Sequence, residues 1–169
     1  MLVVADHTSF SDPLVLLATA GRPIRFLMAR EFYQRPHLRW VFQAFDCIPV
    51  TRGSNDVAAV RTMLRALGQG EVVGLFPEGG IDNHREERGH LGIGYLVLKT
   101  GARVVPVSIV WDRARPVSIV GTLVVPGKAV VHYGAPMVLQ PELHPSRGRL
   151  GEVTAEVMRA IRDLRRLTA

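Results

Sequence analysis

The chain has 169 residues, enough for one domain with a sizeable core, and its 47% hydrophobic and 21% charged residues exclude an intrinsically disordered chain. The formal net charge of +6 predicts a surface that attracts phosphate, on nucleic acid, lipid headgroups or small substrates. The one cysteine excludes an internal disulfide and favours a reduced, intracellular setting, and no apolar stretch approaches the roughly 20 residues that span a bilayer.

Short apolar runs at intervals along the chain predict β-strands. Several of these runs are continuous instead of alternating, which is typical of strands covered on both faces. The predicted strands are residues 2–5, 24–28, 47–50, 72–76, 104–110, 117–120 and 129–133.

Helical periodicity fills the segments between and after these strands. The predicted helices are residues 12–19, 54–67, 92–99 and 150–164. Asp12 is expected to be the N-cap of the first, with Pro13 in its first turn, and Gly101 stands where the third would end. The alternation predicts an α/β fold: a single domain with a central, mostly parallel or mixed sheet flanked by helices.

A histidine and an aspartate stand five positions apart directly after the first predicted strand. His7 and Asp12 therefore lie on the loop that leaves this strand, where a rigid sheet holds residues that substrate can reach. Histidine exchanges protons near neutral pH, and a carboxylate near its second nitrogen fixes the tautomer. The pair indicates a base that activates a hydroxyl; the alternative is a polar turn in which Asp12 only caps a helix.

Two further candidate sites follow later strands. Arg52 comes just after the strand at 47–50, and its planar guanidinium suits phosphate oxygens; the alternative is an ordinary surface arginine. Glu78 and Gly79 follow the strand at 72–76, at the edge where open α/β sheets bind ligands. The alternative for them is a tight turn with a solvated carboxylate.

Other features favour structure over chemistry. Pro106 interrupts a strand pattern and predicts a bulge or a strand edge. The acidic and histidine residues from Asp82 to His90 match no standard ligand spacing, so we expect a solvated loop and no metal site. Cys47 lies in an apolar strand and is expected to be a buried, inert thiol.

Residues 22–45 interleave arginines with aromatic side chains. Such a stretch suits a membrane surface, where rings lie at headgroup depth and cations lie near anionic lipid. The alternative is a core helix with a charged outer face. No signature of an RNA-binding module accompanies the stretch, and we expect no nucleic-acid partner.

Four short blocks occur in a set order along the chain. They are His7-x4-Asp12, Ile-Pro-Val-x-Arg ending at Arg52, Phe-Pro-Glu-Gly over 76–79, and Val-Pro-Val over 105–107. In this order they resemble the glycerolipid acyltransferase family, whose best-known members acylate 1-acylglycerol-3-phosphate. The resemblance extends to Tyr-Gly-Ala-Pro at 133–136 and covers nearly the whole chain.

The resemblance implies a role for each candidate residue. It makes His7 the catalytic base and Asp12 the residue that orients it. It implies that Arg52 grips the phosphate of the acceptor, and that Glu78 and Gly79 help to bind that acceptor. It implies no cofactor, because the acyl group arrives on an acyl-CoA or acyl carrier protein co-substrate.

Three features depart from the family pattern. Asp6 stands where the family usually has asparagine, and Gly80-Ile81 stands where it usually has threonine and arginine. The family also carries an N-terminal, often helical, segment before the first strand, whereas this sequence starts almost at the strand. We therefore expect a single acyltransferase domain over residues 1–169 without that segment.

Together with the His7-Asp12 pair, the resemblance implies an O-acyltransferase that moves a fatty acyl group from a thioester to the hydroxyl of a lysophospholipid, in phospholipid biosynthesis. We expect a cytoplasmic protein that associates peripherally with the membrane surface. Two alternatives remain: a thioester or lipid hydrolase that uses the same His-Asp pair on water, and a non-catalytic lipid-binding protein.

Overall fold

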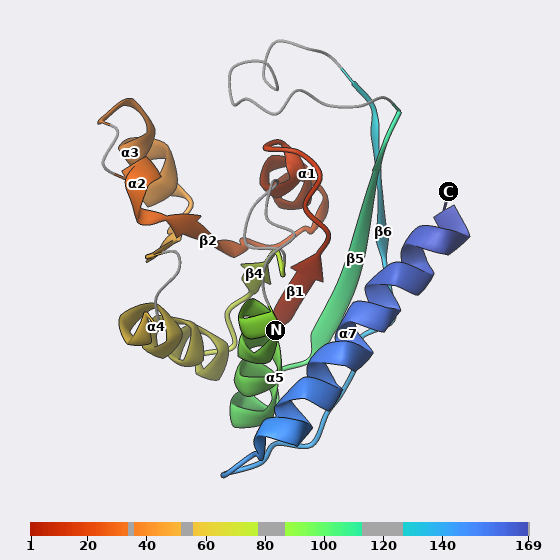
Figure 1. Cartoon of the computed structure of the whole chain (residues 1–169). Coiled ribbons are helices and arrows are strands. Elements are labelled where there is room, and N and C mark those ends of the chain that lie inside the picture. Colours follow the sequence, from red (N-terminus) through yellow and green to blue (C-terminus); the bar gives the residue numbers. More distant parts are fainter. Residues whose placement is uncertain (34–35, 52–55, 78–86, 113–126, 169) are drawn as a thin grey trace.

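The computed structural model describes residues 1–33, 36–51, 56–77, 87–112 and 127–168, and Figure 1 shows their arrangement. The strands are β1 (Leu2–Ala5), β2 (Arg25–Ala29), β3 (Ile48–Val50), β4 (Val73–Leu75), β5 (Val104–Trp111) and β6 (Ala129–Tyr133). The helices are α1 (Asp12–Thr19), α2 (Arg30–Tyr33), α3 (Pro36–Ala44), α4 (Val57–Gly68), α5 (Glu87–Thr100) and α7 (Arg147–Thr168).

The strands form one six-stranded sheet in the order β3-β2-β4-β1-β5-β6. All of the pairings are parallel except that of β6, which runs antiparallel to β5. The expected single α/β domain with a mostly parallel, mixed sheet is therefore confirmed. Strand β1 lies inside the sheet, between β4 and β5, so the residues that follow it start from a rigid position.

The two faces of the sheet pack against different helices (Figure 1). Leu2 and Val4 of β1 point to a core shared with α4, α5 and α7, whereas Val3 and Ala5 point to a core shared with α1. All four side chains are buried, as the continuous apolar run of β1 predicts for a strand covered on both faces. Burying one such Val or Leu side chain stabilises the fold by about 1.5–3 kcal/mol.

Some expected elements have different bounds in the structure. The helix expected from Ser54 begins at Val57, because Asp56 is its N-cap and accepts a hydrogen bond from the Ala59 amide at 3.0 Å. Helix α5 begins at Glu87, five residues before the start expected at Gly92, so it takes up part of the segment expected to be irregular. The strand expected at residues 117–120 lies outside the described residues.

Residues 22–45 are not the single core helix that was one alternative for them. They hold strand β2 and the helices α2 and α3. Trp40 on α3 is 67% exposed and Phe45 just after it is 42% exposed. The aromatic side chains of this stretch are thus divided between the core, where Phe26 is buried, and the surface.

Pro106 lies within β5, and the expected irregularity occurs on the strand beside it. Val107 pairs with Tyr133, and the next antiparallel bridge joins Val104 to Met137. Val105 and Pro106 therefore face the three residues 134–136, one residue more than regular pairing allows. A Cβ on Gly134 would lie 2.8 Å from Pro106 Cγ and 2.4 Å from Leu164 Cδ1, so only glycine fits between β5 and α7 at this point.

Candidate active site

His7 and Asp12 meet at the carboxyl edge of the sheet, as the sequence predicts. His7 Nδ1 and Asp12 Oδ2 are 3.1 Å apart. The Asp12 side chain is completely buried, and 12% of the His7 side chain is exposed. With its proton on Nδ1, His7 donates to the carboxylate and keeps the Nε2 lone pair for a substrate proton. The arrangement supplies an oriented base that a substrate can reach.

Asp12 is the first residue of α1 but not its N-cap, so that part of the prediction is wrong. The N-cap is Ser11, and its side chain makes no capping hydrogen bond. The Asp12 carboxylate instead turns back: Oδ2 accepts hydrogen bonds from the amides of Thr8 and Ser9, each at 2.7 Å. These short, charge-assisted bonds offset the cost of burying the carboxylate and close the turn after β1.

Two aromatic residues that the sequence analysis did not single out complete the site. Trp111, the last residue of β5, donates its indole N–H to Asp12 Oδ1 at 2.9 Å. The ring of Phe76, just after β4, stacks on the imidazole of His7 with centroids 4.2 Å apart. Phe76 is the first residue of the Phe-Pro-Glu-Gly block, a signal that could have pointed to it; nothing near Trp111 in the sequence marks it.

Asp6, the departure beside the histidine, is also tied into the fold. Its side chain is 7% exposed, and Oδ1 accepts a hydrogen bond from the Ile109 amide of β5 at 3.1 Å. Oδ2 lies 3.4 Å from Nη1 of Arg165 on α7. Asp6 and Arg165 line a small cavity of about 70 Å³ together with Pro77, which follows Phe76. The exits of β1 and β4 and the end of α7 therefore come together here.

The other predicted site residues, Arg52, Glu78 and Gly79, lie outside the described residues. The structure does describe the residues that flank Arg52. The Thr51 amide donates to Asp56 Oδ2 at 3.0 Å, which ties the end of β3 to the start of α4. Hydrogen bonds from the Ala59 and Thr51 amides lower the pKa of Asp56 below its ordinary value.

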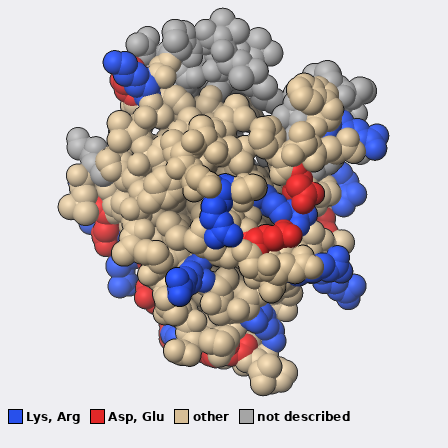
Figure 2. All heavy atoms as spheres, turned by 180° about the vertical axis from the view of Figure 1, so that it is seen from behind, with Lys and Arg blue, Asp and Glu red and all other residues tan. Residues whose placement is uncertain are grey.

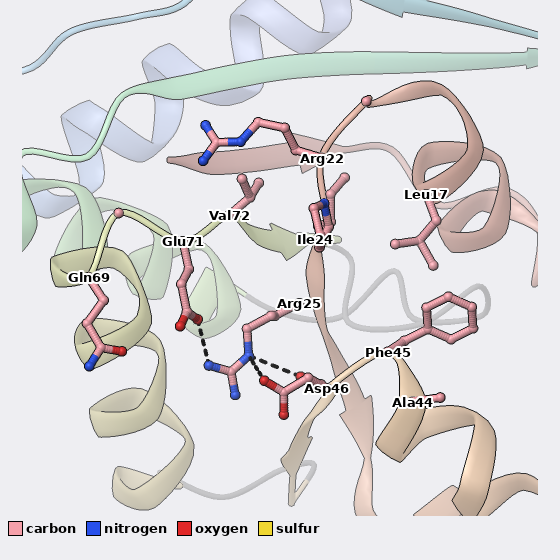
Figure 3. Close-up of a pocket in the computed structure, with 13 residues that line it drawn as sticks. Leu17, Arg22, Ile24, Arg25, Ala44, Phe45, Asp46, Gln69, Glu71 and Val72 are labelled. Carbon is pink, nitrogen blue, oxygen red and sulfur yellow. Dashed lines mark hydrogen bonds and ion pairs between the residues drawn. The ribbon is translucent and has the colours of Figure 1, made fainter.

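A larger groove, of about 790 Å³, lies away from this site (Figure 3). It is lined by Arg25 at the start of β2 and by Val72 just before β4, so it lies at the amino ends of these strands, opposite the edge with His7. Arg25 is held there by Glu71 at 2.7 Å and by Asp46 at 2.9 Å. The guanidinium in the groove is thus already paired with two carboxylates.

The rest of the described surface adds three observations. Figure 2 shows that the side opposite Figure 1 is mostly uncharged, with charged side chains at its margin and in one mixed cluster. Among the described residues, no three His, Cys, Asp or Glu side chains gather in an arrangement that could hold a metal ion. No helix in the described part of the chain is both long and apolar enough to cross a bilayer.

Burial of Cys47, just before β3, raises the pKa of its thiol to about 11, as expected for an inert cysteine. Cys47 lies at the amino edge of the sheet because it precedes β3, whereas His7 lies at the carboxyl edge because it follows β1. The thiol is therefore neutral at physiological pH and is not placed to act as a nucleophile.

Comparison with known proteins adds a family to this geometry. A family model described as Acyltransferase matches residues 1–110. The chain belongs to this acyltransferase family. The matched residues include the His7-Asp12 pair and β5 as far as Val110.

Two individual proteins are also similar to this chain, one in sequence and one in structure. It is 26% identical over 115 residues to the 1-acyl-sn-glycerol-3-phosphate acyltransferase of Borreliella burgdorferi, a match over 64% of this chain and 45% of that protein. Among solved structures, the 1-acyl-sn-glycerophosphate (LPA) acyltransferase PlsC of Thermotoga maritima matches the whole chain with a TM-score of 0.64 at 22% identity. The match covers 66% of that chain, so the present sequence spans less than two thirds of either relative.

Proposed function

We propose that this protein is an O-acyltransferase that transfers a fatty acyl group from a thioester to the hydroxyl of a lysophospholipid such as 1-acylglycerol-3-phosphate. The observation that carries the proposal is the buried Asp12 carboxylate held 3.1 Å from His7 Nδ1. Membership of the acyltransferase family and the names of both relatives support the same chemistry.

In the proposed reaction, Nε2 of His7 removes the proton from the acceptor hydroxyl. The oxygen attacks the thioester carbonyl, a C–O bond forms, the C–S bond breaks, and the thiolate leaves with the proton that His7 releases. Asp12 holds the ring in one tautomer and stabilises the transient imidazolium. No acyl-enzyme is needed, because the acceptor hydroxyl is itself the nucleophile.

For the acceptor, the proposal assigns the phosphate to Arg52 and further contacts to Glu78 and Gly79. The support is positional: β3 precedes Arg52, β4 precedes Glu78, and both strands run parallel to β1, so the three segments leave the sheet at one edge. Glu78 and a phosphate repel each other, so Glu78 is assigned to an acceptor hydroxyl or to an arginine. The donor is proposed to be acyl-CoA or an acyl carrier protein.

We further propose that the protein works at the membrane surface as a peripheral protein of the cytoplasm. Trp40, Phe45 and Leu14 are exposed at 67%, 42% and 44%, and Arg39 is exposed beside Trp40. Exposed rings next to cations suit the headgroup region of an anionic membrane. Sedimentation with anionic vesicles, compared between the wild type and a Trp40→Ser variant, tests this part separately.

The decisive experiment measures thiol release and lipid products with acyl-CoA and acyl carrier protein donors against a panel of lysolipids. We expect acceptor-dependent thiol release and an acylated lipid product. Thiol release that continues without acceptor would identify the hydrolase alternative, and vesicle binding with no thioester consumption would identify the lipid-binding alternative.

Single variants then test the roles of the residues. His7→Ala is expected to abolish transfer while leaving the circular dichroism spectrum and the thermal unfolding midpoint near those of the wild type. His144→Ala is the matched control, because His144 is exposed beyond β6. Arg52→Ala is expected chiefly to raise the KM for a phosphate-bearing acceptor. Normal turnover in folded His7→Ala would contradict the mechanism, and an unchanged KM would remove Arg52 from the phosphate site.

A further inference from the structure

The hairpin of β5 and β6 continues past the end of β1 and extends along the turn that holds the catalytic pair (Figure 1). Strand β5 pairs with β1 from Leu2–Val104 to Ala5–Val107 and then runs on to Trp111. Strand β6 pairs along the opposite edge of β5, from Val107–Tyr133 to Trp111–Ala129, and supports the part of β5 that extends beyond β1. The extra length brings the last side chain of β5 to Asp12, which begins α1 on the same face.

The two oxygens of the Asp12 carboxylate have different partners. Oδ2 has the contacts with His7 Nδ1, the Thr8 amide and the Ser9 amide. Oδ1 accepts the indole N–H of Trp111 at 2.9 Å. Indole is a donor only, so this contact fits the acceptor role of the carboxylate. Because the terminal torsion of an aspartate is broad and roughly two-fold, donors on both oxygens are what hold the carboxylate in one rotation.

We propose that Trp111 is a positioning residue for the catalytic base: its indole N–H fixes the rotation of the Asp12 carboxylate, which in turn holds the His7 ring. The inference rests on the proposed function and deepens it at the same site. It assigns a part in the reaction to a residue 99 positions from Asp12 and outside all four sequence blocks.

A purely structural role makes a different prediction. Trp111 also packs against the core that β1, β2 and β5 share with α1, so its removal costs packing as well as a hydrogen bond. A packing role depends on the size of the ring, whereas the proposed role depends on the N–H. The test must therefore remove the indole N–H while keeping the size of the ring, and it must measure the tautomer of the His7 ring directly.

The kinetic test compares three variants. Trp111→Phe removes the donor, and 3-benzothienylalanine at position 111 keeps a ring of the same size but has sulfur in place of the N–H. We expect both to lower kcat about 10-fold, as for loss of one hydrogen bond to a charged group, with the KM of donor and acceptor within about twofold. Tyr133→Phe is the control, because it removes a 2.7 Å hydrogen bond between the same hairpin and Thr19 of α1 without touching Asp12.

The second test reads the His7 ring and needs no activity. In ¹⁵N-labelled protein we expect His7 in the Nδ1–H tautomer. We expect Asp12→Asn, Trp111→Phe and the sulfur analogue all to give a mixture of the two tautomers. Tyr133→Phe should leave the His7 signals unchanged. The chain has two tryptophans, so two indole N–H signals are expected. The signal of the exposed Trp40 should exchange rapidly with solvent, and that of Trp111 should exchange slowly. The chemical shift of the Trp111 signal should change in Asp12→Asn.

The outcomes separate this inference from the proposed function. If the sulfur analogue has wild-type kcat and wild-type His7 signals, the inference is overturned even though the enzyme transfers acyl groups. If the wild type transfers no acyl group, the proposed function fails, and the tautomer measurement alone decides whether Trp111 positions His7. A Trp111 indole proton that exchanges as fast as that of Trp40 overturns the contact itself.

Discussion

Two strand-to-helix turns lie at the same edge of the sheet, and an aspartate closes each of them. The first turn, residues 6–12, joins β1 to α1 and is closed by Asp12; the second turn joins β3 to α4 and is closed by Asp56. Asp56 divides its oxygens between the turn, through the Thr51 amide, and its own helix, through the Ala59 amide. The Asp12 carboxylate accepts from the Thr8 and Ser9 amides of its turn and from the indole of Trp111, and it lies 3.1 Å from His7 Nδ1.

The difference follows from the surroundings of the two carboxylates. Asp12 is completely buried beside the extended end of β5, which provides the indole donor, whereas the Asp56 side chain is 10% exposed and has Arg30 at 3.8 Å. A buried carboxylate must be satisfied by nearby donors, and those donors fix its direction. The same residue type is thus a helix cap in one turn and, in the other, the partner of the histidine that we propose as the base.

The largest expected effect separates the two carboxylates by their kinetics. Asp12→Asn should lower kcat by about 10²–10⁴-fold, because an amide offers one acceptor oxygen where four donors converge. Asp56→Ala should instead raise the acceptor KM and leave kcat within about twofold, since it loosens the turn and the start of α4 but leaves the contact between His7 and Asp12 in place. Steady-state kinetics with both substrates varied distinguish the two patterns, and an equal loss of kcat in both variants would contradict the comparison.

The next effect concerns stability and its pH dependence at the second turn. The Ala59 and Thr51 amides lower the pKa of Asp56 from its ordinary value of 3.8, so the folded state favours the ionised form more than the unfolded state does. This contribution is complete above the ordinary pKa and is lost as the pH falls through the lowered one. The thermal unfolding midpoint of Asp56→Ala should therefore lie below that of the wild type near neutral pH.

The gap between these two midpoints should narrow below about pH 4, where the wild type loses the ionised cap. Thermal unfolding followed by circular dichroism from pH 7 to pH 3 measures it. A gap that stays constant over this range would show that the charge of Asp56 does not contribute to stability.

A smaller effect on the free energy of unfolding is expected from Asp6, the other buried carboxylate of the first turn. Asp6 is buried and faces the half-exposed Arg165, so Arg165→Gln should lower the free energy of unfolding by about 0.5–1 kcal/mol, a value already reduced for solvent screening. In an Asp6→Asn background the same change should have little effect, because no buried charge is left to pair. Urea unfolding of the four proteins of this cycle gives the coupling, and additive effects would show that the pair does not stabilise the fold.

The smallest effect is expected at the strand that leads into the second turn. Burial raises the pKa of Cys47 to about 11, so the thiol should react with Ellman's reagent at pH 8 far more slowly in the folded protein than in urea. Cys47→Ala should leave transfer unchanged. Rapid modification of the native protein, together with loss of transfer, would place the thiol closer to the chemistry than the fold indicates.

Local patterns in the sequence were enough for much of the fold. The bounds of β1, α1 and β6 are as expected, because a continuous apolar run, an Asp-Pro start and a run of β-formers are all short-range signals. The start of α4 was expected two residues before its cap at Asp56, since Ser54 is as good a local start signal as Asp56. Which of two capping residues is used depends on the chain that packs around them.

The sequence by itself determined the strand-helix alternation, the His7-Asp12 pair and the order of the four blocks, all of which depend on residue type and spacing. Only the tertiary structure decided what the Asp12 carboxylate faces, that Phe76 stacks on His7, and that Asp6 meets Arg165. These contacts join residues from different strands and helices. They depend on where the sheet order places each strand end. In particular they depend on the register of β5 against β1, which decides how much of β5 extends beyond β1 and which no local pattern encodes.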